Sequence, residues 1–398
     1  MLNLRFRLSD LVEVLLLLIF LFYTFQPVNL SIYITILLLG ICTFGLLINP
    51  TAFRKCILFF PFISYAFMSA YLISPLIQDK GIDIEEFYRL VFCLSAFILS
   101  GAHINKTNFE RKWMAFALFL SFLAIIQQVG YLLGFIYLYD FSWLGFFQKI
   151  DSSHTVFRSM SIFYEPGHFA FFLFMPLYLS LTKINYKKYR LIICLGFLST
   201  FSIGSFIFLF FAILLLGVKK YGFRYLFSKA GYLVFLALFF FILYSYNPVI
   251  NEKLNSLIFF DKSYASEYGT TWVLYSSFLA NINAFIESPI FGVGFGGARL
   301  FYENEFYRVF GFGLSELDYR FVIPDALFLM KLTTEIGLVG IIFFCLPFFV
   351  LRNGCTDSYI ALVFAFLISC KMGAYYNPYI YILICYYVCC CSNKVKCK

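Results

Sequence analysis

Long apolar runs separated by short polar loops follow one another along the whole chain. Most runs have about 15 to 26 residues, close to the roughly 20 residues with which a helix crosses a bilayer. They predict about twelve transmembrane helices, at residues 11–25, 30–48, 57–77, 87–102, 113–135, 167–182, 191–202, 204–218, 230–246, 325–350, 358–374 and 377–391. The first run has no small-residue cleavage site at its end, which predicts a retained signal anchor.

One long stretch, residues 247–324, interrupts this pattern with Gly, Asn and charged residues. It contains SPIFGVGFGGARLF, from Ser288 to Phe301, and then returns the chain to the apolar run DALFLMKLTTEIGLVGIIFF. Apolar residues recur at helical spacing from Thr270 to Ser288, which predicts an amphipathic helix on the membrane surface. We expect a single all-α polytopic membrane domain over residues 1–398, with 247–324 as a large segment within it.

The distribution of charge predicts the orientation of this domain. The loops KINYKKYR (Lys183 to Arg190) and KKYGFR (Lys219 to Arg224) are strongly basic, and short cytoplasmic loops collect Lys and Arg. An even number of crossings must separate the two loops, so we expect two short helices that turn near Ser202. The same rule places both termini in the cytoplasm and the segment 247–324 in the periplasm. Most of the 21 acidic residues then lie outside, as an independent check.

Composition supports an integral membrane protein and excludes several other classes. Hydrophobic residues make up 62% of the chain and charged residues 13%, against roughly 25% charged in soluble domains. The net charge of +9 follows from the topology, and no continuous basic face predicts a nucleic-acid partner. All twelve cysteines lie in predicted spans or on the cytoplasmic side, so disulfides are not expected. Three histidines do not favour a His-based metal site, and we expect no cofactor.

Three motifs occur in order along the chain. FRSMSIFYEPGHFAFFL (Phe157 to Leu173) has an Arg followed by Glu-Pro at a helix start. ESPIFGVGFGG has a Pro followed by alternating glycines, and DALFLMKLTTEIGLVGIIFF has a Glu followed by Gly-Leu-x-Gly. In this order and at these topological positions, they resemble elements of the O-antigen polymerase and O-antigen ligase superfamily of bacterial inner-membrane enzymes. The resemblance covers roughly residues 110–390.

The resemblance implies glycosyl transfer at the periplasmic face of the bacterial inner membrane. The implied enzyme is an O-antigen polymerase of surface polysaccharide, which moves a growing glycan from undecaprenyl diphosphate onto a lipid-linked repeat unit. An O-antigen ligase and a lipid-linked oligosaccharide flippase or transporter are the alternatives. The implied partners are the undecaprenyl-diphosphate-linked oligosaccharide, membrane lipid and a regulator of polysaccharide chain length.

Such a reaction needs cations that hold the departing diphosphate. Arg158 is the first candidate, because a guanidinium binds phosphate through two parallel hydrogen bonds. The alternative for Arg158 is a side chain that snorkels to the interface. Other residues at the predicted outer boundary are candidates for the same role, with an ordinary loop charge or a glycine turn as the alternative: Arg299, Arg320, Gly292, Gly294 and Gly296.

The reaction also needs a base that accepts the proton of the attacking hydroxyl. Glu165, at a helix start, is the candidate base, and interaction with the helix dipole is its alternative. His168 would orient Glu165, take the proton itself, or be structural. Asp325 is the third catalytic candidate. Glu335, inside a span, is expected to pair with Lys331 at i, i+4, and the alternative is that it lines the site.

Three departures from the superfamily affect these assignments. Asp325 stands where ligases carry a His, and Thr precedes the Trp of GTTW (Gly269 to Trp272), where they tend to have Arg. Both differences argue against a ligase. Neither Arg158 nor Arg299 has the spacing of ten residues to a Gly that polymerase loops often show, which weakens the residue-level assignments but not the class.

Overall fold

The computed structural model describes residues 2–23, 29–48, 56–73, 84–144, 157–163, 165–222, 224, 269–298, 327–351, 355–372 and 375–392. Every regular element within these ranges is a helix, as the apolar runs predict. Each predicted apolar segment coincides with helical structure except 230–246, which lies outside the described residues.

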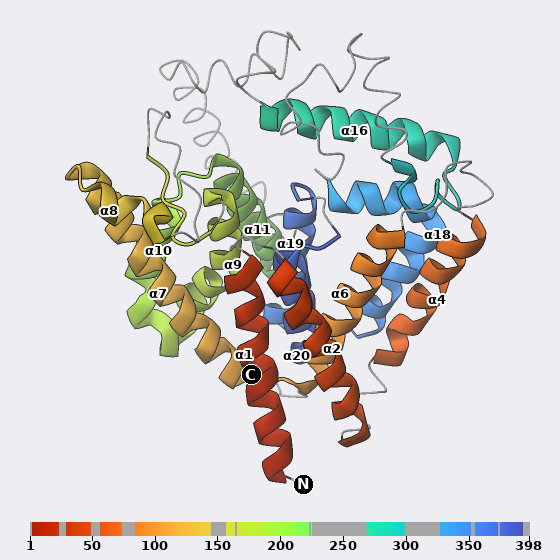
Figure 1. Ribbon diagram of the computed structural model, residues 1–398, viewed down its shortest axis with the longest axis horizontal. Coiled ribbons are helices and arrows are strands. Elements are labelled where there is room, and N and C mark those ends of the chain that lie inside the picture. The colour runs from red at the N-terminus through yellow and green to blue at the C-terminus, as the bar shows by residue number, and fades with distance from the viewer. Residues whose placement is uncertain are drawn as a thin grey trace.

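The longer helices form a bundle in which most run side by side (Figure 1). They are α1 (Leu2–Tyr23), α2 (Asn29–Ile48), α4 (Phe60–Met68), α6 (Ile84–His103), α7 (Lys106–Leu132), α9 (Pro166–Thr182), α10 (Arg190–Leu198), α11 (Ile203–Tyr221), α16 (Gly269–Glu287), α18 (Phe328–Val350), α19 (Thr356–Ser369) and α20 (Pro378–Ser392). Shorter elements join them: η1 (Ile57–Phe59), η2 (Ser69–Ile73), α8 (Ile136–Tyr139), η3 (Phe141–Leu144) and η4 (Ile184–Tyr189).

Four of these helices are long and apolar enough to cross a membrane: Leu30–Leu47, Lys106–Leu132, Gly204–Tyr221 and Phe328–Val350. A pair bent by 119°, Pro166–Thr182 with Ile184–Leu198, brings the number to five if it counts as one span. Many apolar side chains on the described helices face outward. Leu47, Leu132 and Phe349 are 81%, 74% and 73% exposed, which suits a lipid-facing surface. The chain therefore has several helices that could cross a membrane, while twelve spans with both termini inside remain a prediction.

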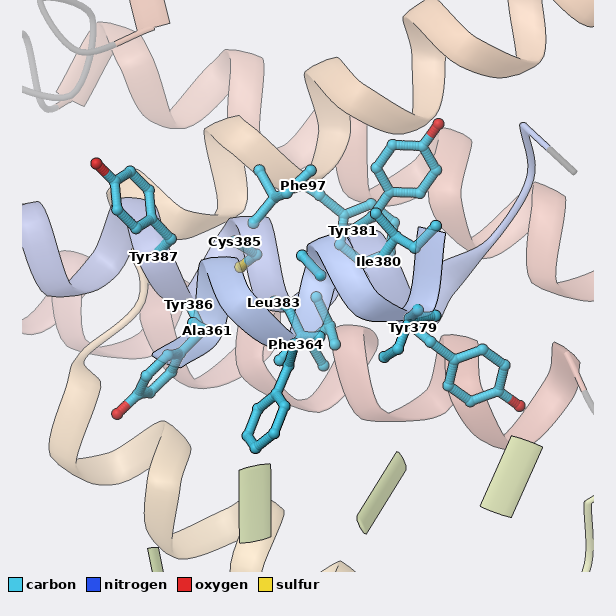
Figure 2. Packing of buried hydrophobic residues seen from close by; sticks show 14 of the residues in the cluster. Phe97, Ala361, Phe364, Tyr379, Ile380, Tyr381, Leu383, Cys385, Tyr386 and Tyr387 are labelled. Atoms are coloured by element: carbon cyan, nitrogen blue, oxygen red, sulfur yellow. The ribbon is translucent and has the colours of Figure 1, made fainter. Parts of the chain in front are cut away.

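Helix α20 lies in the middle of the bundle, among α1, α6, α7, α9 and α19. Its side chains from Ile380 to Val388 are almost completely buried, which is typical of a helix that is apolar on all sides. Its tyrosines leave the axis in several directions (Figure 2), and Tyr381 and Tyr387 donate to backbone carbonyls at 2.7 and 2.5 Å. Buried tyrosines need such partners, so α20 is held by polar contacts as well as packing.

One end of the bundle is held by lysines paired with buried or half-buried acids. Lys106 Nζ lies 2.7 Å from Asp357 Oδ2, and Lys183 Nζ lies 2.7 Å from Glu110 Oε1. A third lysine of this end, Lys112, lies 2.7 Å from a buried glutamate of α1. Lys183 belongs to the basic loop KINYKKYR, which the charge pattern predicts to be cytoplasmic.

Helix α16 lies at the opposite end, across the tops of the bundle helices (Figure 1). The predicted surface helix at 270–288 is therefore confirmed as a helix, with the bounds Gly269–Glu287. The predicted turn near Ser202 is also confirmed, because α10 ends at Leu198 and α11 begins at Ile203.

Helix α18 differs from the single span expected at 325–350. It begins at Phe328 and is interrupted at Gly337, whose φ of 66° lies outside the helical region. Only glycine adopts this backbone conformation routinely. The two parts of α18 therefore run in different directions, and the break falls inside the Glu-x-Gly-Leu motif.

Candidate functional site

The segment that carries Arg158 is fastened to α7 by one amide side chain. Gln127 Nε2 donates to Ser161 O at 2.9 Å, and Gln127 Oε1 accepts from Ser161 N at 2.7 Å. Ser161 has a φ of 54°, a conformation that costs a non-glycine residue energy unless its surroundings fix it. The buried Gln127 side chain supplies those contacts, so the backbone beside Arg158 has one defined position.

Two further contacts place Arg158 itself. Phe157 stacks on Tyr131 of α7, with ring centroids 4.5 Å apart. Ser159 N donates to Ser199 O at 2.9 Å, in the turn between α10 and α11. Between these anchors, Arg158 Nε donates to Thr200 O at 3.4 Å. Arg158 therefore lies at the junction of α7 and the α10–α11 turn, half-buried.

The guanidinium of Arg158 keeps most of its donors available. Among the residues that the structure describes, its terminal nitrogens have no hydrogen-bond partner. Burial lowers the pKa of Arg158, and the Glu165 carboxylate nearby opposes that shift. A partly desolvated cation with a free guanidinium fork is well suited to a bidentate contact with phosphate.

Glu165 stands at the N-cap of α9, and Pro166 occupies the first helical position. Proline is common at this position, because the backbone N–H that it lacks would have no hydrogen-bond partner within the helix there. The Glu165 side chain makes no capping hydrogen bond and is exposed. Its carboxylate is therefore available to a hydroxyl that approaches from outside, as a general base requires.

His168 lies on the first turn of α9, between aromatic rings. Its ring centroid is 5.4 Å from that of Tyr379 and 6.4 Å from that of Tyr23. Its Nδ1 atom is buried and has no hydrogen-bond partner within the described ranges. This enclosure favours a role in orienting neighbouring groups over direct proton transfer.

Lys371 is a further charged residue near the start of α9, and no sequence motif marks it. A methyl group added at Gly167 would lie 3.3 Å from Lys371 Nζ, and one added at Gly204 would lie 3.4 Å from it. The ammonium group therefore lies beside the first turns of α9 and α11. We call Arg158, Glu165, His168 and Lys371 the α9 cluster. The sequence feature that could have indicated Lys371 is the pair Gly167 and Gly204, each in the first turn of a helix.

The glycine motif lies elsewhere, against the break in α18. Val293 N donates to Thr334 O at 2.9 Å, and Gly294 N donates to Glu335 O at 3.0 Å. Gly296 N donates to Glu335 Oε1 at 3.1 Å. The second and third sequence motifs are thus paired through their backbones, with Gly337 providing the bend that makes room.

Backbone conformation and limited space explain why glycines occupy these positions. Gly292, Gly294 and Gly296 all have φ near +80° (78°, 83° and 81°), and a methyl group at Gly292 would lie 2.4 Å from Glu335 O. The N–H groups of these three glycines donate to protein oxygens. A phosphate cradle formed by these N–H groups would need those bonds to break, so we leave the glycines out of the proposed ligand set.

The expected pair of Lys331 with Glu335 is wrong. Lys331 Nζ lies 2.9 Å from Glu86 Oε2 on α6 and 4.5 Å from the centre of the Tyr375 ring. Glu335 accepts from Gly296 N and from the Tyr375 hydroxyl. Helical spacing brings Lys331 and Glu335 to one face, but contacts with α6 and with the turn before α20 decide their partners.

The start of α20 connects the two regions. Tyr375, just before α20, donates to Glu335, while the Tyr376 ring packs 5.5 Å from Tyr23. Tyr23 in turn packs against His168. The first motif and the paired second and third motifs therefore lie at the same end of the bundle, opposite the lysine network.

Three predicted site residues, Arg299, Arg320 and Asp325, lie outside the described residues. Of the segment 247–324, the structure describes 269–298. Within the described ranges, no group of three or more His, Cys, Asp or Glu side chains could hold a metal ion, and no disulfide joins the cysteines there.

Two comparisons with known proteins complete the description of the site. A scan of known protein families finds none that matches this chain. A search of the curated proteins finds no match either. The function is therefore argued from the residues and their arrangement.

Proposed function

We propose that this chain is an inner-membrane polymerase of bacterial surface polysaccharide. It would transfer a growing glycan from undecaprenyl diphosphate onto a lipid-linked repeat unit at the periplasmic face. The observation that supports this most is the α9 cluster. There, the half-buried Arg158, whose terminal nitrogens have no partner among the described residues, lies near the Glu165 carboxylate, which makes no capping hydrogen bond. A cation for the leaving group and a base for the nucleophile are the two groups that this transfer needs.

In the proposed reaction, the acceptor hydroxyl attacks the anomeric carbon of the donor sugar. The new glycosidic bond forms as the bond between that carbon and the phosphate oxygen breaks, and the diphosphate leaves with the electron pair. Glu165 accepts the hydroxyl proton. Arg158 holds the diphosphate as its negative charge grows. His168, enclosed by tyrosine rings, contributes to the position of the α9 first turn.

The proposed topology has about twelve spans, with both termini in the cytoplasm. Its support is the distribution of charge, because the lysine network gathers at one end of the bundle and the α9 cluster at the other. Short cytoplasmic loops collect Lys and Arg. The α9 cluster would then face the periplasm, where lipid-linked repeat units are joined.

Deletion of the gene tests the proposed function. Loss of the enzyme should leave single repeat units on the lipid core, because export and ligation continue without polymerisation. A gel of surface polysaccharide then shows one short band in place of a ladder. Complete absence of repeats would reject the polymerase and favour the ligase or the flippase. An unchanged ladder would reject all three.

A labelling experiment tests the proposed orientation. In a variant without native cysteines, a single Cys at Ser263 should react with a membrane-impermeant maleimide in cells whose outer membrane alone is permeabilised. A Cys at Lys187, in the basic loop of η4, is the matched control and should react only after lysis of the inner membrane. The reverse pattern would overturn the orientation and the periplasmic site with it.

A further inference from the structure

We propose that the exposed lysines of η4 and of the last turn of α11 form a binding surface for anionic phospholipid headgroups. We call Lys187, Lys188 and Lys220 the surface lysines. They lie outside the α9 cluster, and the inference does not rest on the proposed function. It requires only that the bundle lies in a membrane, for which several helices are long and apolar enough.

The two basic loops meet at the start of α19. Lys183, directly before η4, lies 3.1 Å from Asp357 Oδ2. Lys219 of α11 donates to Cys355 O at 3.4 Å, and its ammonium lies 4.3 Å from the centre of the Tyr359 ring. Cys355 and Tyr359 are each two residues from Asp357. The surface lysines of both loops therefore belong to one end of the bundle and to one region of it.

The lysines at this end fall into a paired and an unpaired group. Lys106, Lys112 and Lys183 each have a carboxylate oxygen 2.7 Å from the ammonium nitrogen. The surface lysines are exposed, and within the described ranges none of them has a carboxylate partner. The Glu110 and Asp357 carboxylates are already held by the paired group. The charge of the surface lysines is therefore left for a partner from outside.

Tyrosine rings accompany two of the surface lysines. Lys188 Nζ lies 4.9 Å from the centre of the Tyr189 ring, and Lys220 Nζ lies 5.0 Å from that of Tyr221. Such contacts favour a cation over the ring without neutralising its charge. Tyrosines are also enriched where a membrane protein meets the headgroup region. The pairs of lysine and tyrosine therefore suit the boundary between membrane and water.

Exposed apolar side chains beside the lysines favour lipid over a soluble partner. Ile184 is 88% exposed and Leu191 is 69% exposed, and they stand on either side of Lys187 and Lys188 in the sequence. The chain turns by 119° between α9 and the helix that begins with η4, so these residues lie where two helices end. Hydrocarbon next to a headgroup layer matches apolar and cationic side chains together, whereas an acidic soluble protein matches the charge alone.

The charge of the surface lysines is complementary to an anionic phospholipid. Anionic leaflets attract basic segments at the membrane surface, by roughly fivefold in affinity for each Lys or Arg near it. A lysine ammonium binds phosphate as a compact point charge and needs no fixed geometry. Three exposed ammonium groups at a membrane boundary therefore indicate a preference for lipids whose headgroups carry a net negative charge.

Titration of a fluorescent phosphatidylglycerol with the purified full-length protein in detergent tests the inference. Fluorescence anisotropy should show tighter binding than for phosphatidylcholine with the same chains and fluorophore. Lys187→Gln combined with Lys188→Gln should weaken the binding of phosphatidylglycerol about tenfold or more, because two attractive charges are lost. Added salt should weaken it as well. Equal binding of the two lipids by the unmodified chain would overturn the inference.

Two further variants separate charge from local structure. Lys187→Arg combined with Lys188→Arg is the matched control, which keeps both charges and should bind phosphatidylglycerol as the unmodified chain does. Lys220→Gln, on the other loop, should weaken binding roughly fivefold. A loss in the arginine variant as large as in the glutamine variant would contradict the electrostatic role. Unchanged affinity in Lys220→Gln would contradict a surface shared by both loops.

Competition identifies the class of partner. Glycerol phosphate and poly-glutamate should displace the fluorescent phosphatidylglycerol only at far higher concentrations than unlabelled phosphatidylglycerol does. Displacement by glycerol phosphate at the same concentration would identify a free phosphate ester, and displacement by poly-glutamate would identify an acidic protein. Either result would overturn the assignment to lipid. These measurements use no polysaccharide, so an unchanged ladder on gene deletion would reject the polymerase and leave the lipid surface standing.

Discussion

Replacement of Arg158 by alanine is expected to abolish the polysaccharide ladder without lowering the amount of protein in the membrane. A guanidinium at the edge of the hydrocarbon would hold the donor through charge-assisted bonds worth roughly 1.5 to 3 kcal/mol each. Arg158→Lys should leave at most a small residue of polymer, because lysine keeps the charge but loses the fork of parallel donors. The measurement is a gel of surface polysaccharide from the deletion strain that carries each variant, with an immunoblot of membranes.

Arg190 is the matched control for Arg158. It donates to Ser180 O at 3.2 Å and Leu181 O at 3.1 Å at the opposite end of the bundle, so Arg190→Lys should leave the ladder normal. A normal ladder in Arg158→Lys would show that a simple charge is sufficient, as for a residue that snorkels to the interface. The diphosphate role would then fall to Arg299 and Arg320.

Replacement of Glu110 by leucine is expected to lower the free energy of unfolding by about 3 kcal/mol, the lower end of the range for breaking a buried ion pair. Glu110 is 3% exposed and accepts from Lys183 at 2.7 Å and from the Tyr386 hydroxyl at 2.5 Å. Without it, Lys106 and Lys183 share Asp357 alone. Thermal unfolding of the purified protein and its amount in the membrane measure the effect.

Two further variants distinguish the network from a general loss of packing. Glu110→Leu combined with Lys183→Met removes both charges and should recover part of the lost stability, because the pair of Lys106 with Asp357 remains and apolar replacements of buried pairs are often tolerated. Asp10→Ala breaks a pair whose aspartate is 58% exposed and should cost less than about 1 kcal/mol. Equal losses in the single and double Glu110 variants would contradict the network.

The sequence by itself determined where the helices lie, because the length and spacing of apolar runs are local properties of the chain. The helix at 270–288 was predicted in this way and is present as α16, while the turn near Ser202 was predicted from the two basic loops that flank it and is present as the α10–α11 turn. Arg158 and Glu165 were also proposed from sequence as site residues, because both belong to one motif in which an Arg precedes Glu-Pro at a helix start. In these cases a few consecutive residues contain the whole signal.

Only the tertiary structure decided which distant segments meet. At the break in α18, the backbone around Gly337 contacts the glycine motif, which lies about forty residues earlier in the chain. Leu338 N donates to Pro289 O at 3.0 Å in this contact. Lys331 pairs with Glu86 of α6 instead of its helical neighbour. Lys371 joins the α9 cluster because two glycines from different helices leave space for its ammonium. Such contacts depend on packing between segments far apart in sequence, which no local pattern contains.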